Sequence, residues 1–562
     1  MRSAVRRFSA ACVAGALAIT LAACAESQRD PGSEQGGADG TGGTMVFGAA
    51  GAPRSFDPLF AQDGETFRVS RQIYDTLITY KQGTSELEPA LATSWTPSPD
   101  GTEWTFTLRE GVKFHDGSDF NAEAVCFNFN RWFNLPTAAA QSQAIYYYET
   151  FGGYANNLTE DTTDPVYNSC QAPNPTTAVV KLNRAKGAFP AAFGLTSLSI
   201  SSPTALQQYN ADEVTQSGES FSYSAYANEH PTGTGPFRFE SYDRTNQTIT
   251  LVRNDQYWGQ PAKLDRLIFR VIPDENARKQ ELQSGTIDGF DFPSAADWPA
   301  LEEAGHQVLV RPVFNILYLG INQQKKPSAN PAMQDVRVRQ AIAHAIDRES
   351  LVRTQFPEGA VVASQFIPET VAGYNPDLQP IPYDPERARA LLAEAGASNL
   401  TVDFYYPTEV SRPYMPNPTN IFTAIAENLR QVGITVNPVA QPWNGGYLDS
   451  VQVNGVHDLH LLGWTGDYND AGNFLGSFFG SAGAEFGLTP DSPIIAGINQ
   501  ADATVGEEPH AAAYRDVNEL IMDQLPGVPL SSSPPAIVVR QGVSGLIPSP
   551  LTDERFLTVS VD

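Results

Sequence analysis

Helices and strands alternate in the second half of the sequence, and this alternation constrains the fold more than any other feature. The first unit, residues 384–396, opens with an Asp-Pro pair, typical of a helix N-cap and first helical position, and closes at a glycine. In the second unit, residues 421–436, Ile421, Ile425 and Leu429 mark the apolar stripe of a helix that ends near a glycine and precedes a strand. Helix-then-strand units of this length predict an α/β fold with a largely parallel sheet covered by helices.

Residues 460–474 predict a strand that ends in a loop punctuated by glycines. Leu461 and Leu462 are strand-like, and glycines then interrupt the run. Ligand contacts concentrate in such loops because a strand end delivers its side chains to the mouth of a cleft. Asp467, flanked by aromatic residues, is suited to hold a ligand ammonium in a partly desolvated pocket, and the alternative is an ordinary turn aspartate. The loop contains Gly463, Trp464, Thr465, Gly466, Asp467 and Tyr468.

The block of residues 91–117 is the most recognisable part of the sequence. Asp100 and Gly101 are a strong hairpin signal between two strand-like runs. The His-Asp-Gly run at 115–117 has two interpretations, a catalytic dyad or a second tight turn with a satisfied histidine, and the pattern favours the turn. Four further blocks, of different sequence, are also distinctive, at residues 233–237, 254–258, 335–348 and 463–468.

In this order, the blocks resemble the signature of the family 5 extracellular solute-binding proteins, the peptide and nickel receptors of ABC importers. The resemblance implies two α/β lobes of the periplasmic-binding-protein type II, cluster C, with an extra domain inserted in the first lobe. The lobes should close on the ligand about connecting segments near residues 311–317 and 523–531. The implied division is residues 44–78, 196–310 and 528–562 for the first lobe, 79–195 for the inserted domain, and 311–527 for the second lobe with the main ligand-anchoring loop.

The resemblance also implies roles for charged residues of the second lobe. Asp467 stands where peptide-binding members carry the aspartate that grips the α-ammonium of the ligand. Residues 411–418 resemble the segment of dipeptide-binding members whose arginine and tyrosine, here Arg412 and Tyr414, take the C-terminal carboxylate. Arginine suits this role because its planar fork meets a carboxylate with two parallel hydrogen bonds. The alternative for Arg412 is a surface ion pair.

Two tryptophans complete the implied ligand site. Trp443 and Trp464 are expected to line side-chain pockets, or to stack on a sugar in an oligosaccharide receptor. Many relatives carry proline where this sequence has Ala471, so the loop after Asp467 is free to follow a different backbone path.

The N-terminus predicts export and lipid attachment. Arg2, Arg6 and Arg7 precede an apolar run of about 12 residues, too short for the ~20 that cross a bilayer, so residues 1–23 are expected to be a signal peptide. Cys24 follows Leu-Ala-Ala and resembles the lipidated cysteine of bacterial lipoproteins, the alternative being ordinary cleavage beside a chance cysteine. Residues 24–43 should form a flexible tether. The mature protein is thus expected on the outer face of the cytoplasmic membrane, held by its lipid.

Two cysteines remain once Cys12 is removed and Cys24 carries lipid. Cys126 and Cys170 would then lie in an oxidising compartment, which favours a disulfide between them over two buried thiols. In the chain-entropy model, closing that loop contributes on the order of 4 kcal/mol.

Charge and length exclude some classes of partner. The formal net charge is −27, and loss of the three arginines of the signal peptide brings it to −30. This acidity argues against nucleic acid or an anionic surface as partner. A chain of 562 residues has room for two or three domains with ample core.

Enzyme motifs are missing from the sequence. There is no Gly-x-Ser-x-Gly elbow, no His-Glu-x-x-His and no phosphate-binding Gly-Lys-Ser/Thr loop. His457 and His460 lie three apart in a strand-like run, so they are expected to face opposite sides. No catalytic residue, metal site or cofactor is therefore expected.

These observations predict a lipid-anchored, monomeric receptor that captures di- or short oligopeptides and hands them to the transmembrane subunits of an ABC permease. Within the family, the alternatives are a receptor for haem, a nickel chelate or an oligosaccharide. Outside it, the alternatives are a peptide-processing enzyme or an adhesive surface protein.

Overall fold

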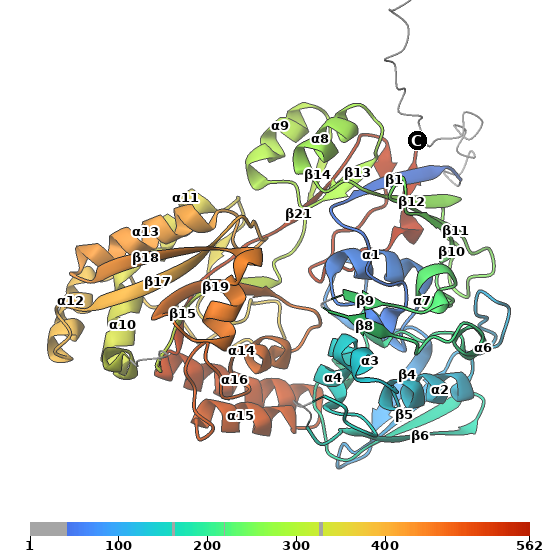
Figure 1. The fold of residues 1–562 in the computed structure, drawn as a ribbon, viewed down its shortest axis with the longest axis horizontal. Coiled ribbons are helices and arrows are strands. Elements are labelled where there is room, and N and C mark those ends of the chain that lie inside the picture. Colours follow the sequence, from blue (N-terminus) through green and yellow to red (C-terminus); the bar gives the residue numbers. More distant parts are fainter. Residues whose placement is uncertain (1–41, 160–162, 219, 325–329) are drawn as a thin grey trace, which may run out of the picture.

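Two lobes lie side by side in the computed structural model, and a further domain lies against the first of them (Figure 1). The structure describes residues 42–159, 163–218, 220–324 and 330–562. The predicted signal peptide, the tether up to residue 41 and Cys24 lie outside the described residues. Within the described part of the chain, no helix has the length and apolar character needed to cross a membrane.

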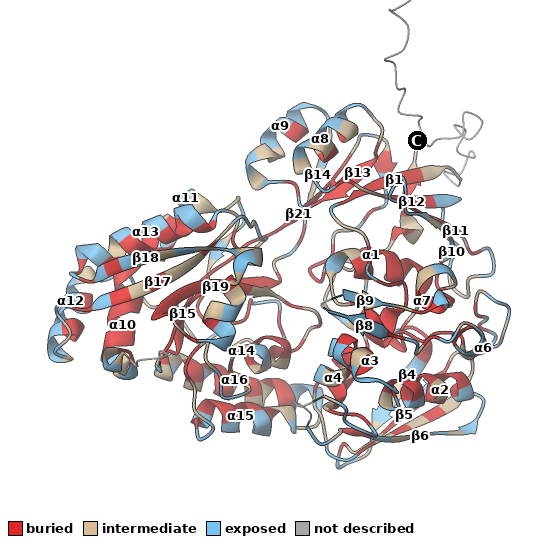
Figure 2. Cartoon of the chain, viewed as in Figure 1, coloured by how far each residue is buried: buried red, intermediate tan, exposed pale blue. Residues whose placement is uncertain are grey.

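The first lobe is built on a seven-stranded sheet with the order β10-β11-β12-β1-β13-β21-β14. Strand β1 pairs in parallel with both β12 and β13, whereas β21 runs antiparallel to β13 and β14. The central strands and α1 are mostly buried, whereas helices α8 and α9 expose their outer faces (Figure 2). The elements are β1 (Thr44–Ala49), α1 (Gly64–Ile73), β10 (Phe237–Asp243), β11 (Thr248–Arg253), β12 (Arg266–Val271), α8 (Glu275–Gln283), β13 (Gly289–Asp291), α9 (Trp298–Glu303), β14 (Gln307–Val310) and β21 (Ala536–Val539).

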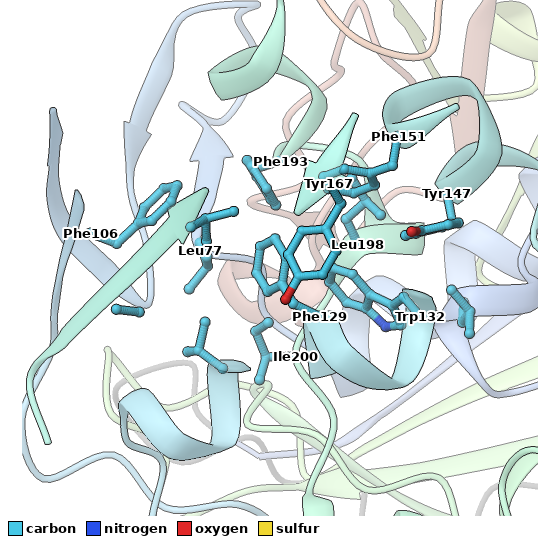
Figure 3. Close-up of a cluster of buried hydrophobic side chains, with 14 of the residues drawn as sticks. Leu77, Phe106, Phe129, Trp132, Tyr147, Phe151, Tyr167, Phe193, Leu198 and Ile200 are labelled. Carbon is cyan, nitrogen blue, oxygen red and sulfur yellow. The ribbon is translucent and has the colours of Figure 1, made fainter. Parts of the chain in front are cut away.

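The inserted domain contains a four-stranded antiparallel sheet with the order β4-β5-β7-β6. Helix α2 packs against β6 and β7, and a disulfide between Cys126 on α2 and Cys170 on β6 joins the two elements, with a Cα–Cα distance of 5.1 Å. Aromatic side chains, among them Phe129, Trp132 and Phe151, fill the space between sheet and helices (Figure 3). The elements are β2 (Ile78–Tyr80), β3 (Leu87–Pro89), β4 (Ala92–Pro97), β5 (Glu103–Leu108), α2 (Ala122–Phe133), α3 (Ala138–Gln143), α4 (Ile145–Phe151), β6 (Tyr167–Asn174) and β7 (Thr177–Leu182).

The second lobe is built on a six-stranded sheet with the order β16-β20-β15-β19-β17-β18. Its elements are β15 (Asn315–Ile321), α10 (Val336–Ala345), α11 (Arg348–Gln355), β16 (Val361–Val362), α12 (Pro385–Glu394), β17 (Thr401–Thr408), α13 (Pro418–Gln431), β18 (Thr435–Pro442), β19 (Leu459–Thr465), α15 (Pro493–Asp502), α16 (Glu507–Gln524) and β20 (Gly527–Ser532). Both predicted helix-then-strand units are confirmed, as α12–β17 and α13–β18. The Asp384 side chain accepts a hydrogen bond from the backbone N–H of Arg387 at 2.8 Å and so caps α12.

The expectation of a largely parallel sheet is wrong for half of this lobe. Strands β17, β18 and β19 are parallel, but β15, β20 and β16 pair antiparallel. The reason is connectivity, since β15 follows directly from the first lobe and β20 leads directly back to it. Strand β15 in particular is reached without the crossover helix that a parallel pair requires.

Two segments connect the lobes, at residues 311–314 and 533–535. The first lies within the expected connection, but the second lies beyond residues 523–531. The expected domain boundary at 527/528 is also wrong, because β20 pairs with β15 of the second lobe. The two connections bind each other, since the Asn315 Nδ2 donates to the Ser533 carbonyl at 2.7 Å and the Arg311 N–H donates to the Pro535 carbonyl at 2.8 Å. The rest of the domain division remains our proposal.

Arg311, the first residue of the first connection, is completely buried. Its guanidinium donates to both carboxylate oxygens of Glu554, at 2.7 and 3.1 Å, and to Asp291 at 2.7 Å. Arg68 of α1 also pairs with Asp291. Burial alone lowers the pKa of Arg311, but the charges of Asp291 and Glu554 raise it overall, so the guanidinium stays charged.

Replacing Arg311 by methionine should lower the free energy of unfolding by about 3–5 kcal/mol, because the partner carboxylates stay buried without this cation. Urea unfolding measures the loss. The matched control is Arg430→Met in the last turn of α13, where Arg430 and Glu427 lie 4.0 Å apart and are largely exposed. That change should cost less than about 1 kcal/mol. Equal losses in the two variants would contradict a structural role for the Arg311 network.

Candidate functional site

Three predicted site residues follow the carboxyl ends of three parallel strands. Arg412 comes after β17, Trp443 directly after β18, and Asp467 directly after β19. Because β17 pairs in parallel with both β18 and β19, these ends lie at one edge of the sheet. Ligands of open α/β sheets bind outside such an edge.

Asp467 is partly buried and accepts hydrogen bonds from two directions. The Tyr146 hydroxyl donates to Oδ1 at 3.0 Å, and the Asn473 amide donates to Oδ2 at 3.4 Å. The backbone N–H of Asp467 in turn donates to the Asn473 Oδ1 at 2.7 Å, which fixes the loop. Burial raises the pKa of Asp467 to about 6, although the hydrogen bonds from Tyr146 and Asn473 lower it. Among the described residues, no cation forms an ion pair with this carboxylate.

Arg412 is exposed and stacks on an aromatic surface. Its guanidinium carbon lies 4.7 Å from the centre of the Trp443 ring, and Trp443 stacks on Tyr447 with ring centres 6.1 Å apart. In the part of the chain that the structure describes, Arg412 has no carboxylate partner. Its guanidinium is thus held in place while its charge remains available to a ligand.

Tyr414 packs against the strand that carries the aspartate. A Cβ atom at Gly463 would lie 2.4 Å from the Tyr414 ring and 2.3 Å from the Ile316 carbonyl oxygen, so glycine is required for this close approach. Burial raises the pKa of Tyr414 to about 12, while the charge of Arg412 lowers it and that of Glu485 raises it. The phenol therefore lies within electrostatic reach of both Arg412 and Glu485.

The other residues of the loop have packing roles. Thr465 pairs with Asn315 in the sheet, and a Cβ atom at Gly466 would lie 2.3 Å from the Phe314 ring. Tyr468 is buried in the apolar cluster beneath the loop. The indole of Trp464 donates to the Asn473 Oδ1 at 3.4 Å, so it helps to orient the amide that binds Asp467.

The same loop also contacts the inserted domain. Tyr146, the hydroxyl partner of Asp467, lies on α4 of that domain. The backbone N–H of Asn469 donates to the Tyr80 hydroxyl and its side chain donates to the Ser85 carbonyl, both at 2.9 Å. Helices α15 and α16 extend toward the inserted domain as well (Figure 1), and the Gly187 N–H donates to the Asp502 carbonyl at 2.7 Å. The loop around Asp467 is therefore part of the contact between the second lobe and the inserted domain.

The sequence prediction did not include Tyr146, Asn473 or Glu485. Tyr146 belongs to a run of three tyrosines outside the recognised blocks, and no pattern in that run indicated a partner in the second lobe. Asn473 lies six residues after Asp467 and within the stretch that the sequence singled out, so its proximity offered a signal.

Comparison with known proteins assigns the family. Residues 86–486 match the model described as bacterial extracellular solute-binding proteins, family 5 middle. The chain belongs to this family. The match confirms the resemblance, and the two-lobed α/β fold is confirmed with it.

Relatives of this family 5 protein have names that refer to two kinds of ligand. The chain is 31% identical to heme-binding protein A of Haemophilus influenzae, over 97% of this chain and 98% of the relative. It is 30% identical to the dipeptide-binding protein of Escherichia coli K12, over 92% and 95%. Among solved structures, the periplasmic binding protein DppA of Helicobacter pylori in complex with the peptide STSA matches with a TM-score of 0.70 and 28% identity, covering 93% of this chain and 98% of that one.

Two histidines of this family 5 protein depart from the sequence prediction. The rings of His457 and His460 lie 4.5 Å apart instead of facing opposite sides, because β19 begins at Leu459 and the strand alternation does not reach His457. His460 contacts the Glu485 carboxylate at 3.1 Å. Among the described residues, no group of three or more His, Cys, Asp or Glu side chains is arranged to hold a metal ion.

The His-Asp-Gly run forms a turn and not a dyad. The His115 ring bonds the Gly235 carbonyl oxygen at 2.9 Å, while Asp116 accepts from Ser118 and Ser202. A hollow of about 230 Å³ lies beside His115, and one of about 30 Å³ beside Asp75. No residue of the sheet edge lines either hollow. The edge is the candidate site because of its charged side chains, Asp467 and Arg412, and not because of a cavity.

Replacing Asp467 by asparagine should stabilise the ligand-free protein, and the gain should depend on pH. The folded-state pKa lies above the ordinary value of 3.8, so the folded protein holds a proton more tightly than the unfolded chain and loses stability as pH rises toward 6. The gain in melting temperature should therefore be small near pH 4 and level off above pH 7. Asp470→Asn is the matched control, since Asp470 binds His510 at 2.8 Å and its change should destabilise the protein at pH 7. A lower melting temperature of Asp467→Asn at pH 7 would contradict the inference that burial disfavours the ionised carboxylate.

Proposed function

We propose that this family 5 substrate-binding protein is the receptor of an ABC importer for di- or short oligopeptides, which it captures between its lobes and delivers to a membrane permease. The observation that carries the proposal is the charge arrangement at one sheet edge. Asp467 is a desolvated carboxylate without a cation among the described residues, and Arg412 is a guanidinium without a carboxylate there. A short zwitterionic peptide supplies both missing charges.

The proposed binding mode assigns a role to each site residue. Asp467, oriented by Tyr146 and Asn473, takes the peptide ammonium, and Arg412, supported by Trp443, takes the carboxylate. Tyr414 and Trp464 line the path between them, with Gly463, Thr465, Gly466 and Tyr468 shaping the loop. An extended residue spans ~3.3–3.6 Å, so a di- to tetrapeptide places its two charges about 6–14 Å apart.

A haem receptor is the second candidate, because the Haemophilus influenzae relative is named a heme-binding protein. Haem offers two propionates, which suit Arg412, and no ammonium for Asp467. The charge arrangement therefore favours the peptide. A nickel chelate or an oligosaccharide fits the two opposite charges less well than a zwitterion.

In this proposal the protein is a receptor and not an enzyme. It is a monomer that delivers its ligand to the permease subunits. Incubation with alanyl-phenylalanine should leave the peptide intact, as followed by mass spectrometry. Release of free alanine in proportion to protein would favour a peptide-processing enzyme.

Asp467→Ala should weaken binding of alanyl-phenylalanine by roughly 30- to several-thousand-fold, because removing one partner of a desolvated charge pair costs ~2–5 kcal/mol. Acetylating the peptide N-terminus should weaken wild-type binding to a similar degree and matter little in the variant. Titration calorimetry over this double cycle measures the coupling.

Equal losses on acetylation in both proteins would show that Asp467 does not read the ammonium. A parallel titration with haem, followed by its absorbance, separates the second candidate. The haem receptor would replace the peptide receptor as the proposal if the wild type binds haem tightly, Asp467→Ala binds it equally well, and neither protein binds the peptide.

Cys24→Ala should release the protein into the medium or block its processing, since we propose that a diacylated Cys24 anchors it to the outer face of the cytoplasmic membrane. One acyl chain binds a membrane only marginally, whereas two hold stably. Cell fractionation with immunoblotting measures the distribution. A variant that is correctly cleaved and stays with the membrane would contradict the lipid anchor.

A further inference from the structure

His510 lies on α16 at a point where three parts of the molecule meet. Its side chain is buried, and both ring nitrogens have hydrogen-bond partners. Nδ1 lies 2.9 Å from the Ala501 carbonyl oxygen near the end of α15, and Nε2 lies 2.8 Å from the Asp470 carboxylate in the loop after β19. The inserted domain supplies a third neighbour, Gly187, where a Cβ atom would overlap the His510 ring. His510 therefore contacts the loop around Asp467, α15 and the inserted domain at once.

The two hydrogen-bond partners of the ring require a charged imidazolium. A carbonyl oxygen and an ionised carboxylate only accept hydrogen bonds, so each ring nitrogen has to donate one. A neutral ring carries a proton on one nitrogen alone, and its other nitrogen would direct a lone pair at an oxygen atom. Burial by itself lowers the pKa of His510, but the hydrogen bond and the charge of Asp470 raise the pKa overall. Geometry and electrostatics therefore agree on the protonated form.

Asp470 links the position of His510 to the loop around Asp467. Its other carboxylate oxygen accepts a hydrogen bond from the backbone N–H of Gly472 at 2.7 Å, which fixes the start of the next helical turn. The following residue is Asn473, whose side chain donates to the Asp467 carboxylate and accepts from the Asp467 backbone N–H. A continuous series of hydrogen bonds therefore joins the His510 ring to the carboxylate of the proposed ammonium site.

The same histidine forms part of the surface against which the inserted domain packs. The Gly187 N–H donates to the Asp502 carbonyl oxygen at 2.7 Å, and the Lys186 ammonium lies 3.6 Å from the Asp502 carboxylate. A Cβ atom at position 187 would also overlap the Thr504 carbonyl oxygen, so only glycine permits this close approach. A shift of the His510 ring would therefore alter both the loop and this contact.

Acidic groups dominate the surroundings of the ring. Asp502 on α15 adds a second negative charge that raises the pKa of His510, and the charge of Lys186 is paired with that same carboxylate. On α16 itself, the Tyr514 ring lies one turn later with its centre 5.0 Å from that of His510. The titratable groups around the ring are Tyr468 and Asp470 in the loop, Asp502 on α15, Glu507 and Tyr514 on α16, and Lys186 in the inserted domain.

We propose that His510 is a positioning residue of the ligand site, whose imidazolium holds the loop around Asp467 against the inserted domain, so that ligand binding weakens when the ring loses its proton. The inference rests on the proposed peptide function. Without the proton, Asp470 or Ala501 would face a lone pair, and the loop would lose the preorganisation that favours binding. Catalysis by His510 and Asp470 does not fit, because both ring nitrogens are bonded within the protein and neither is available to a substrate.

The test combines two measurements on the full chain between about pH 6.5 and about pH 9. Nitrogen NMR of isotope-labelled histidines shows where the His510 ring loses its proton, and its signals are assigned by their absence in His510→Gln. Titration calorimetry with alanyl-phenylalanine gives the ratio of the dissociation constants of His510→Gln and the wild type at each pH. The ionisation of the peptide cancels in this ratio, because both proteins meet the same peptide.

The wild-type ring should be an imidazolium at about pH 6.5, because its pKa in the folded protein lies above the ordinary value. His510→Gln should bind the peptide on the order of tenfold more weakly at that pH. The ratio should fall toward one across the same pH interval in which the NMR signals report loss of the proton, because the wild type then lacks the imidazolium as well.

His344→Gln is the matched control in the same lobe. The His344 ring bonds the Pro382 carbonyl oxygen at 2.9 Å, and a neutral histidine can donate that bond. This variant should bind the peptide as the wild type does at every pH. If His510→Gln does not fold, Asp470→Asn removes the other half of the ion pair, so it should give the same pH profile and serve to assign the His510 signals.

A ratio that does not change with pH, or a His510 ring that is neutral at about pH 6.5, would overturn this inference and leave the peptide function standing. Absence of peptide binding in the wild type would overturn the proposed function and the inference with it.

Discussion

The two-lobed arrangement depends on the buried pairing of Arg311 with Glu554 and Asp291. Arg311 begins one of the two segments that connect the lobes, and its guanidinium is bound by carboxylates that belong to the first lobe. The other connection is tied to the first by hydrogen bonds from Arg311 and Asn315. Because a buried charge that loses its partner is strongly unfavourable, these segments start from one fixed point in the first lobe.

Strand direction in the second lobe explains where the site lies. Residues near positions 412, 443 and 467 are far apart in the sequence, yet three parallel strands deliver them to one edge. The fold thus places a carboxylate and a guanidinium where neither forms an ion pair within the described residues. This placement disfavours the ionised form of Asp467, because burial raises the pKa of its carboxyl group to about 6. In the proposed function, a ligand of opposite charge would relieve that unfavourable burial.

The sequence predicted what depends on local pattern and on family blocks. Helices α12 and α13, the strand ending at Thr465 and the loop around Asp467 were all visible as periodicity, caps and glycines. The parallel sheet was predicted too broadly, and the domain boundary at 527/528 was misplaced, because strand pairing is a non-local property. The same limit applied to His457, which lies outside the strand whose alternation was assumed. Tyr146 approaches Asp467 from more than 300 positions earlier in the chain, and only the tertiary contact reveals it.

Asn469 ties the loop around Asp467 to the inserted domain. Two residues after the aspartate, its backbone and side chain bind Tyr80 and Ser85 across the contact between the lobes. In the proposed binding mode, the segment that holds the ligand also closes the path by which the ligand leaves. In that mode, dissociation requires these hydrogen bonds to break, so the rate of their opening would limit the residence time of the ligand. An external partner such as a docked permease would then speed release by opening the same contact.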